Sequence, residues 1–155
     1  MAAQPRHVKG GTAVDLLVNI DVDDLASAER FYTSAFDLAV GRRFGTSGVE
    51  LVGASSRIYL LVKAAGSQAT GTPANPRSYD RHWTPVHIDV VVADIDLAVQ
   101  KAQQAGAVLE RPVQSSAWGK LALMADPFGH GFCLVEFTGR GYDEIATPQE
   151  DAHHA

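Results

Sequence analysis

The stretch His87-Ile88-Asp89-Val90-Val91-Val92-Ala93-Asp94 aligns, at a constant offset of 70 residues, with Leu17-Val18-Asn19-Ile20-Asp21-Val22-Asp23-Asp24. In both stretches β-branched residues precede an aspartate, and the pattern is typical of a strand that leads into a capped helix. Two such segments in one chain predict an internal repeat. We therefore expect two copies of one structural unit.

The first copy is expected over residues 14–63. Val14 to Val22 predicts a strand that carries Asn19 and Asp21 on its polar face. Asp23 or Asp24 is expected to cap a helix, because an apolar stripe at helical spacing follows. Three further strand-like runs are separated by glycine- and serine-rich turns, at residues 39–44, 49–52 and 57–63. The element order is β-α-β-β-β.

The second copy is expected over residues 85–137 and repeats this order. Asp94 begins a helix that Gly106 ends, and strand-like runs follow at residues 108–113, 120–125 and 131–137. Residues 64–84, rich in Gly, Pro, Ser and Thr, are expected to link the copies. We expect an N-terminal extension over residues 1–13 and a C-terminal tail over residues 138–155, with one α+β domain, 14–137, between them.

Composition limits the possible partners. The chain has 155 residues, of which 46% are hydrophobic and 20% charged, as in globular domains. Its formal net charge is −5 and its longest basic run is the pair Arg42-Arg43, so we expect no nucleic-acid partner. No apolar run is long enough for a membrane span. The single cysteine, Cys133, cannot form an internal disulfide, which favours a cytoplasmic protein.

Three sequence segments carry a family resemblance: V-H-I-D-V-V-V-A-D at 86–94, A-G-A at 105–107 and D-P-F-G-H-G-F-C-L-V-E-F at 126–137. Together with the first-half repeat, they resemble the vicinal oxygen chelate superfamily of glyoxalases, bleomycin-resistance proteins and extradiol dioxygenases. The resemblance implies two tandem β-α-β-β-β modules, whose curled mixed sheets enclose a cavity. It also implies a homodimer.

The resemblance further implies where a metal ion would bind. Metalloenzymes of this superfamily hold a divalent ion with side chains from the first and fourth strands of each half, and the corresponding positions here are Leu17, Tyr59, His87 and Cys133. Only His87 matches the family pattern. We therefore expect no metal and no other cofactor. The alternative is a divalent ion such as Ni, Zn, Mn or Fe, for which Asp21, His87 and Asp89 are chemically suitable ligands.

The candidate catalytic residues are His87 and Asp89, which share one face of their strand. An imidazole serves as a general acid or base near neutral pH, and a carboxylate beside it orients it. The alternative is a histidine and an aspartate that only bind each other. The candidate ligand-binding residues, which the first strand, the two fourth strands and a loop supply, are Asn19, Asp21, Tyr59, Trp118 and Cys133. Tyr59 is also compatible with a simple cavity wall and Cys133 with a small buried apolar residue.

Two functions follow as hypotheses. The first is a glyoxalase- and bleomycin-resistance-like protein that binds a small molecule between its modules without the family metal. The second is a divalent-metal-dependent lyase, isomerase or dioxygenase that uses His87.

Overall fold

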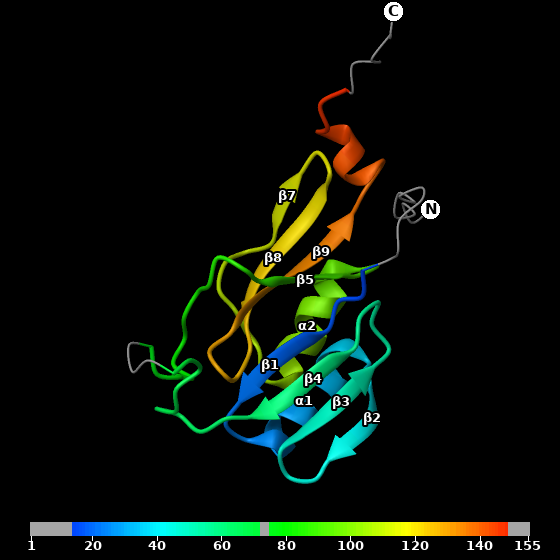
Figure 1. Ribbon diagram of the computed structural model, residues 1–155. Coiled ribbons are helices and arrows are strands. Elements are labelled where there is room, and N and C mark those ends of the chain that lie inside the picture. Colours follow the sequence, from blue (N-terminus) through cyan, green and yellow to red (C-terminus); the bar gives the residue numbers. More distant parts are fainter. Residues whose placement is uncertain (1–13, 72–74, 149–155) are drawn as a thin grey trace, which may run out of the picture.

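The computed structural model describes residues 14–71 and 75–148, and each expected copy forms one sheet with one helix (Figure 1). The first module runs in the order β1 (Val18–Val22), α1 (Leu25–Phe36), β2 (Ala39–Phe44), β3 (Gly48–Val52) and β4 (Ile58–Val62). Its strands are ordered β1-β4-β3-β2, with β1 parallel to β4 and the other pairs antiparallel. The parallel pair is the one that α1 connects.

The second module repeats this topology with one extra strand. It runs in the order β5 (Ile88–Val91), α2 (Ile95–Ala105), β6 (Val108–Leu109), β7 (Gln114–Ser116), β8 (Gly119–Ala125) and β9 (Gly131–Phe137). The strand order is β5-β9-β8-β6, with β7 also paired to β8. Strand β5 is parallel to β9, as β1 is to β4. The predicted α+β architecture of two modules is confirmed.

Two predicted strands differ from the structure. Strand β1 begins at Val18, not Val14, because its pairing partner β4 begins at Ile58, opposite Val18. Of the run expected from Val108 to Val113, only Val108–Leu109 is a strand, β6. The next strand, β7, begins after the run, at Gln114. Pro112 lies between them, and proline has no N–H to donate to a sheet.

Both helices begin at the predicted aspartates. Asp24 accepts a hydrogen bond from the Ser27 backbone N–H at 2.7 Å, and Asp94 accepts one from the Leu97 N–H at 3.1 Å. Gly106 ends α2 with a φ of 117°, a conformation that glycine adopts most readily. Glu136 points away from Cys133, as strand alternation predicts, and accepts the Ile95 N–H at 2.7 Å.

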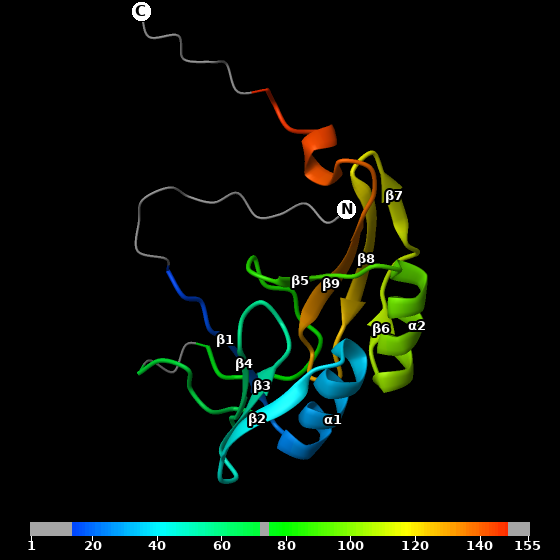
Figure 2. The ribbon, with the colours of Figure 1, turned by 90° about the vertical axis from the view of Figure 1, so that its right-hand side faces the viewer.

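Each helix covers one face of its own sheet, and the two helices also contact each other (Figure 2). This arrangement produces one continuous core from both modules, in which the largest fully buried side chains include Phe31, Leu51, Leu60, Ile95, Met124 and Leu134. The Tyr32 hydroxyl on α1 donates to Asp126, in the turn after β8, at 2.5 Å. The modules are therefore joined by apolar packing and by a buried hydrogen bond.

The remaining described segments are irregular. The connection 64–84 contacts both modules: the Tyr79 hydroxyl donates to the Lys63 carbonyl at 2.6 Å, and His82 forms an isolated bridge with His130. A short 3-10 helix, Gly141–Glu144, follows β9. The extension 1–13 and the end of the tail, 149–155, lie outside the described residues. Among the described helices, none is long and apolar enough to cross a membrane.

Candidate functional site

A cavity of about 570 Å³ lies where the two modules meet, lined by residues of β1 and β5 and of the connection that precedes β5. Both strands are outer strands of their sheets. The apolar part of its wall is formed by Val18, Ile20, Tyr32, Phe36, Ile58, Val86, Ile88 and Phe132. This volume is in the range that small-molecule sites occupy.

The polar part of the cavity wall gathers side chains from both modules. It is formed by Asn19, Asp21, His82, Thr84, His87 and His130. Three of these residues, Asn19, Asp21 and His87, are candidates from the sequence. A mostly apolar wall with a few converging polar groups is typical of a ligand site.

His82 and His130 are held by backbone carbonyls, which fixes their tautomers. Nδ1 of His82 lies 2.9 Å from the Asp80 carbonyl oxygen, and Nε2 of His130 lies 2.7 Å from the Asp21 carbonyl oxygen. A carbonyl oxygen can only accept, so each of these nitrogens carries the proton. In the neutral rings, Nε2 of His82 and Nδ1 of His130 therefore remain as hydrogen-bond acceptors. The two ring centroids are 5.3 Å apart.

Asp21 forms an ion pair through its side chain, in addition to the hydrogen bond that its backbone carbonyl accepts from His130. Its Oδ2 lies 2.7 Å from Nε of Arg77, and both side chains are partly buried. Arg77 also donates to the Gln68 carbonyl at 2.9 Å. The Asp21 carboxylate thus anchors the connection between the modules to the end of β1. It does not join His87 and Asp89 in a metal-ligand group among the described residues.

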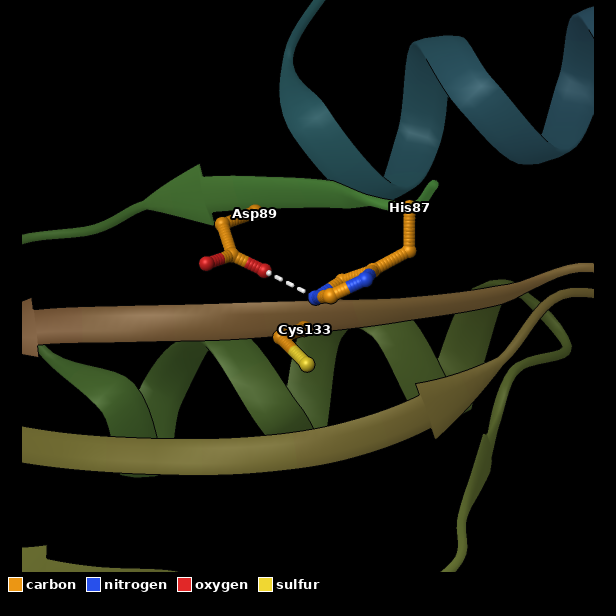
Figure 3. A group of neighbouring side chains, drawn as sticks. All are labelled: His87, Asp89 and Cys133. Atoms are coloured by element: carbon orange, nitrogen blue, oxygen red, sulfur yellow. Dashed lines mark ion pairs between the residues drawn. The ribbon is translucent and has the colours of Figure 1, made fainter. Parts of the chain in front are cut away.

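His87, Asp89 and Cys133 form a second cluster, on the face of the β5–β9 sheet that points away from α2 (Figure 3). Nε2 of His87 lies 3.2 Å from Oδ1 of Asp89, and Asp89 is directly opposite Cys133 in the β5–β9 register. The predicted His87–Asp89 pair is therefore present. Trp83 lies against the imidazole with a ring-centroid distance of 4.7 Å.

The Cys133 thiol is poorly suited to nucleophilic attack. Burial raises its pKa to about 11, with a further contribution from the neighbouring Asp89 carboxylate. Only a small fraction of it is therefore ionised at neutral pH. Cys133 and His87 both line a smaller pocket of about 220 Å³ with Trp83, Arg111 and Gln114. His87 thus borders both this pocket and the larger cavity.

Two candidates from the sequence lie apart from these pockets. The Tyr59 hydroxyl donates to Glu50 at 2.8 Å, and the Arg42 guanidinium beside Glu50 is the main reason that the pKa of this carboxyl falls to about 2. Trp118 packs on Tyr142 with a ring-centroid distance of 5.1 Å. Neither Tyr59 nor Trp118 is among the residues that line the pockets described here.

The model of the family described as the Glyoxalase-like domain matches residues 17–135, most of the chain. The chain belongs to the vicinal oxygen chelate superfamily. A relative, the uncharacterized protein Mb0911c of Mycobacterium bovis, is 37% identical over 119 residues, which are 73% of this chain and 76% of that one. The uncharacterized protein Rv0887c of Mycobacterium tuberculosis is also 37% identical over 119 residues, 73% of this chain and 68% of that one.

Solved structures share the glyoxalase-like fold at low sequence identity. The fosfomycin resistance protein FosX from Listeria monocytogenes has a TM-score of 0.65 and 16% identity, covering 88% of this chain and 100% of that chain. A glyoxalase/bleomycin resistance protein/dioxygenase family enzyme from Burkholderia phytofirmans has a TM-score of 0.62 and 20% identity, covering 81% and 100%. These likenesses establish the fold.

Of the four positions at which the resemblance implies metal ligands, the structure brings two, His87 and Cys133, close together. Leu17 offers no donor atom and is 59% exposed. The Tyr59 hydroxyl is bound to Glu50. His87 and Cys133 lie together in the second module, where Asp89 is their neighbour. Among the described residues, the close group of potential ligands therefore lies in the second module.

Sequence reasoning did not select His82 and His130 as site residues. His130 follows the D-P-F-G turn, which orders the backbone: Asp126 accepts hydrogen bonds from the N–H groups of Phe128 and His130, each at 2.8 Å. His82 lies in a connection whose path depends on contacts far along the chain. The sequence offers one weak signal, that both histidines lie in or beside segments expected to be loops.

Proposed function

We propose that this glyoxalase-like protein binds a small molecule in the cavity between its modules, without the four-ligand metal site of the superfamily. The observation that carries the proposal is the cavity of about 570 Å³ with apolar walls and clustered polar groups. Burial of the ligand's apolar body would drive binding, at roughly 25 cal/mol per Å² of buried surface. The polar groups would fix its orientation.

The polar groups favour a ligand that donates hydrogen bonds or carries a positive charge. The free nitrogens of His82 and His130 are acceptors in the neutral rings, because the other nitrogen of each ring donates to a backbone carbonyl. The chain also has a net charge of −5, which attracts cations at long range. We therefore expect an amphipathic molecule with an amine or a similar donor group.

A second candidate function is supported by the contact between His87 and Asp89. Asp89 would orient the imidazole, and His87 would then act as a general base on a substrate held in the cavity that it lines. This is the lyase, isomerase or dioxygenase alternative, for which the family chemistry would need a divalent ion. Turnover of a bound compound, lost in His87→Ala, would favour this alternative over simple binding.

We also propose a homodimer in the cytoplasm. Several apolar side chains in or just before the outer strands β1 and β5 are exposed in the single chain, among them Leu17, Val86 and Val91 at 59%, 85% and 62%. Apolar surface of this kind is often covered by a partner. The single free thiol of Cys133 is consistent with a reducing compartment. Light scattering coupled to size exclusion would report twice the monomer mass.

A screen of fluorinated fragments by ligand-observed NMR tests the binding proposal. We expect several amine-containing fragments to bind the wild-type protein. Val86→Trp, at a cavity-lining residue that is 85% exposed, should abolish this binding because the indole fills the entrance. Val108→Trp is the matched control, since Val108 is 60% exposed and does not line the cavity. Equal binding to both variants would refute a site in the cavity.

A further inference from the structure

The side chains of His87, Asp89 and Cys133 converge on one point of the second module (Figure 3). One potential ligand atom from each residue lies within 4.8 Å of the other two. The convergence follows from the sheet: Asp89 and Cys133 are direct neighbours on parallel strands, and His87 is two residues before Asp89 and so shares its face. In the part of the chain that the structure describes, this is the one group of three such residues that lie so close together.

We propose that His87, Asp89 and Cys133 bind one divalent metal ion of the zinc type. The set combines an imidazole nitrogen, a carboxylate oxygen and a sulfur, all of which are zinc ligands, at bond lengths of roughly 2.0 to 2.3 Å. Two ligands of one tetrahedral ion lie roughly 3.3 to 3.8 Å apart at such bond lengths. The three ligand atoms lie within 4.8 Å of one another without an ion. Binding would shorten the longest of these distances by about 1 Å.

One ligand of the site is held rigidly and the other two can move towards it. Cys133 is buried and fixed in the middle of β9. The side chains of His87 and Asp89 are 32% and 38% exposed, so they have room to adjust. Trp83 packs on the imidazole and restricts its movement on one side. The carboxylate and the thiolate together neutralise the charge of a divalent ion, which favours the site in a partly buried position.

Two of these ligands, His87 and Cys133, stand at second-module positions of the superfamily's ligand set. The third, Asp89, is outside that set, and no ligand comes from the first module. The site leaves one coordination position open. The smaller pocket lies beside it, lined by His87, Cys133 and Arg111, and His87 also borders the larger cavity. A water molecule or an anionic group of a ligand would complete the coordination. The ion binds whether or not the larger cavity takes a small molecule, so the two proposals are tested separately.

Titration of the reduced, metal-free protein with Co²⁺ under nitrogen tests the site, because Co²⁺ substitutes for Zn²⁺ and reports on its ligands. The full chain is used without a polyhistidine tag and with His153→Ala and His154→Ala, since adjacent imidazoles bind Co²⁺ by themselves. We expect a sulfur-to-cobalt charge-transfer band that saturates at one equivalent and disappears when one equivalent of Zn²⁺ is added. The band requires a bond from Cys133, the only thiol.

Four variants make the test specific. Cys133→Ser should remove the charge-transfer band. His87→Ala and Asp89→Asn, at partly exposed side chains, should keep the fold and weaken Co²⁺ binding at least tenfold. Asp96→Asn, in the first turn of α2 and outside the cluster, is the control and should bind as the wild type does. The proposal is overturned if the wild-type protein gives no charge-transfer band, or if His87→Ala and Asp89→Asn bind Co²⁺ as tightly as the control.

Discussion

Tyr32 and Asp126 show how single residues join the two modules. Both are buried, and the Tyr32 hydroxyl donates to the Asp126 carboxylate across 94 positions of sequence. Burial raises the pKa of Tyr32 well above 10, and the Asp126 charge raises it further, so the phenol stays protonated as a donor. The Asp126 carboxylate accepts hydrogen bonds from this hydroxyl and from two backbone N–H groups.

Tyr32→Phe should lower the free energy of unfolding by about 1–3 kcal/mol, because a buried carboxylate loses one of its donors. Urea unfolding followed by circular dichroism measures the change. Tyr142→Phe is the control, because Tyr142 is 50% exposed and surface substitutions usually change stability by less than about 0.5 kcal/mol. Equal effects in both variants would contradict a special role for the Tyr32–Asp126 contact.

Glu50 should make the first module sensitive to acid. The pKa of its carboxyl is lowered from 4.5 to about 2, first by hydrogen bonds from Arg42 and also by the Tyr59 hydroxyl. The folded state therefore binds this proton less readily than the unfolded state, and the stabilisation is complete above pH 4.5. It is lost as the pH falls from 4.5 towards 2.

Glu50→Gln should accordingly show a shallower loss of stability than the wild type over this pH range. The measurement is the urea midpoint as a function of pH. Glu144→Gln is a suitable comparison, since Glu144 pairs with Arg140, whose side chain is 71% exposed, and solvent weakens such pairs. If the urea midpoint of Glu50→Gln falls with pH as steeply as that of the wild type, the Glu50 carboxyl is not the source of the acid sensitivity.

At the scale of elements, the turn before β9 fixes the connection between the modules. Gly129 has a φ of 86°, and a Cβ at this position would lie 2.3 Å from the Asp80 carbonyl oxygen. The Gly129 carbonyl accepts the His82 N–H at 3.0 Å. The close approach of these two backbone segments places His82 beside His130.

Gly129→Ala should therefore destabilise the protein more than Gly66→Ala. Gly66 has a similar φ of 79°, but a Cβ there would have nothing within 4 Å. Both substitutions incur the backbone cost of about 1–2 kcal/mol, and Gly129→Ala should add about 1–3 kcal/mol for the steric clash. Thermal and urea unfolding measure the difference. Equal stability of the two variants would contradict the close packing of the connection on the turn.

The elements also show how far the sequence determines the structure. The repeat, both capping aspartates and the stop at Gly106 follow from local patterns, and the structure confirms them. The start of β1, the early end of β6 and the existence of β7 were missed, because they depend on which residues face each other in the sheet. Local periodicity contains no information on that pairing.

The site was less predictable than the fold. Strand alternation placed Asn19, Asp21 and His87 at one cavity and brought Asp89 beside His87. It did not reveal that Tyr59 is bound to Glu50, because that contact joins neighbouring strands whose register was unknown. The positions of His82 and His130 depend on the path of an irregular connection, which has no periodic pattern to interpret.

At the scale of the whole molecule, the two repeated units contact each other near their outer strands, β1 and β5. The cavity lies there, with polar groups from both halves. The three-residue cluster, by contrast, belongs to the second half alone. The two halves have therefore diverged: the first carries the buried Glu50 ion pair and the second carries the potential metal ligands.

The central claim is that the space between β1 and β5 receives a small molecule. The most direct test is to map a bound amine-containing fragment by backbone NMR, with assigned spectra of the wild-type protein. We predict shift changes that depend on fragment concentration at Asn19, His82 and His130, all of which line the cavity. Changes confined to residues outside this cavity, or no changes with any fragment of a diverse set, would contradict the claim.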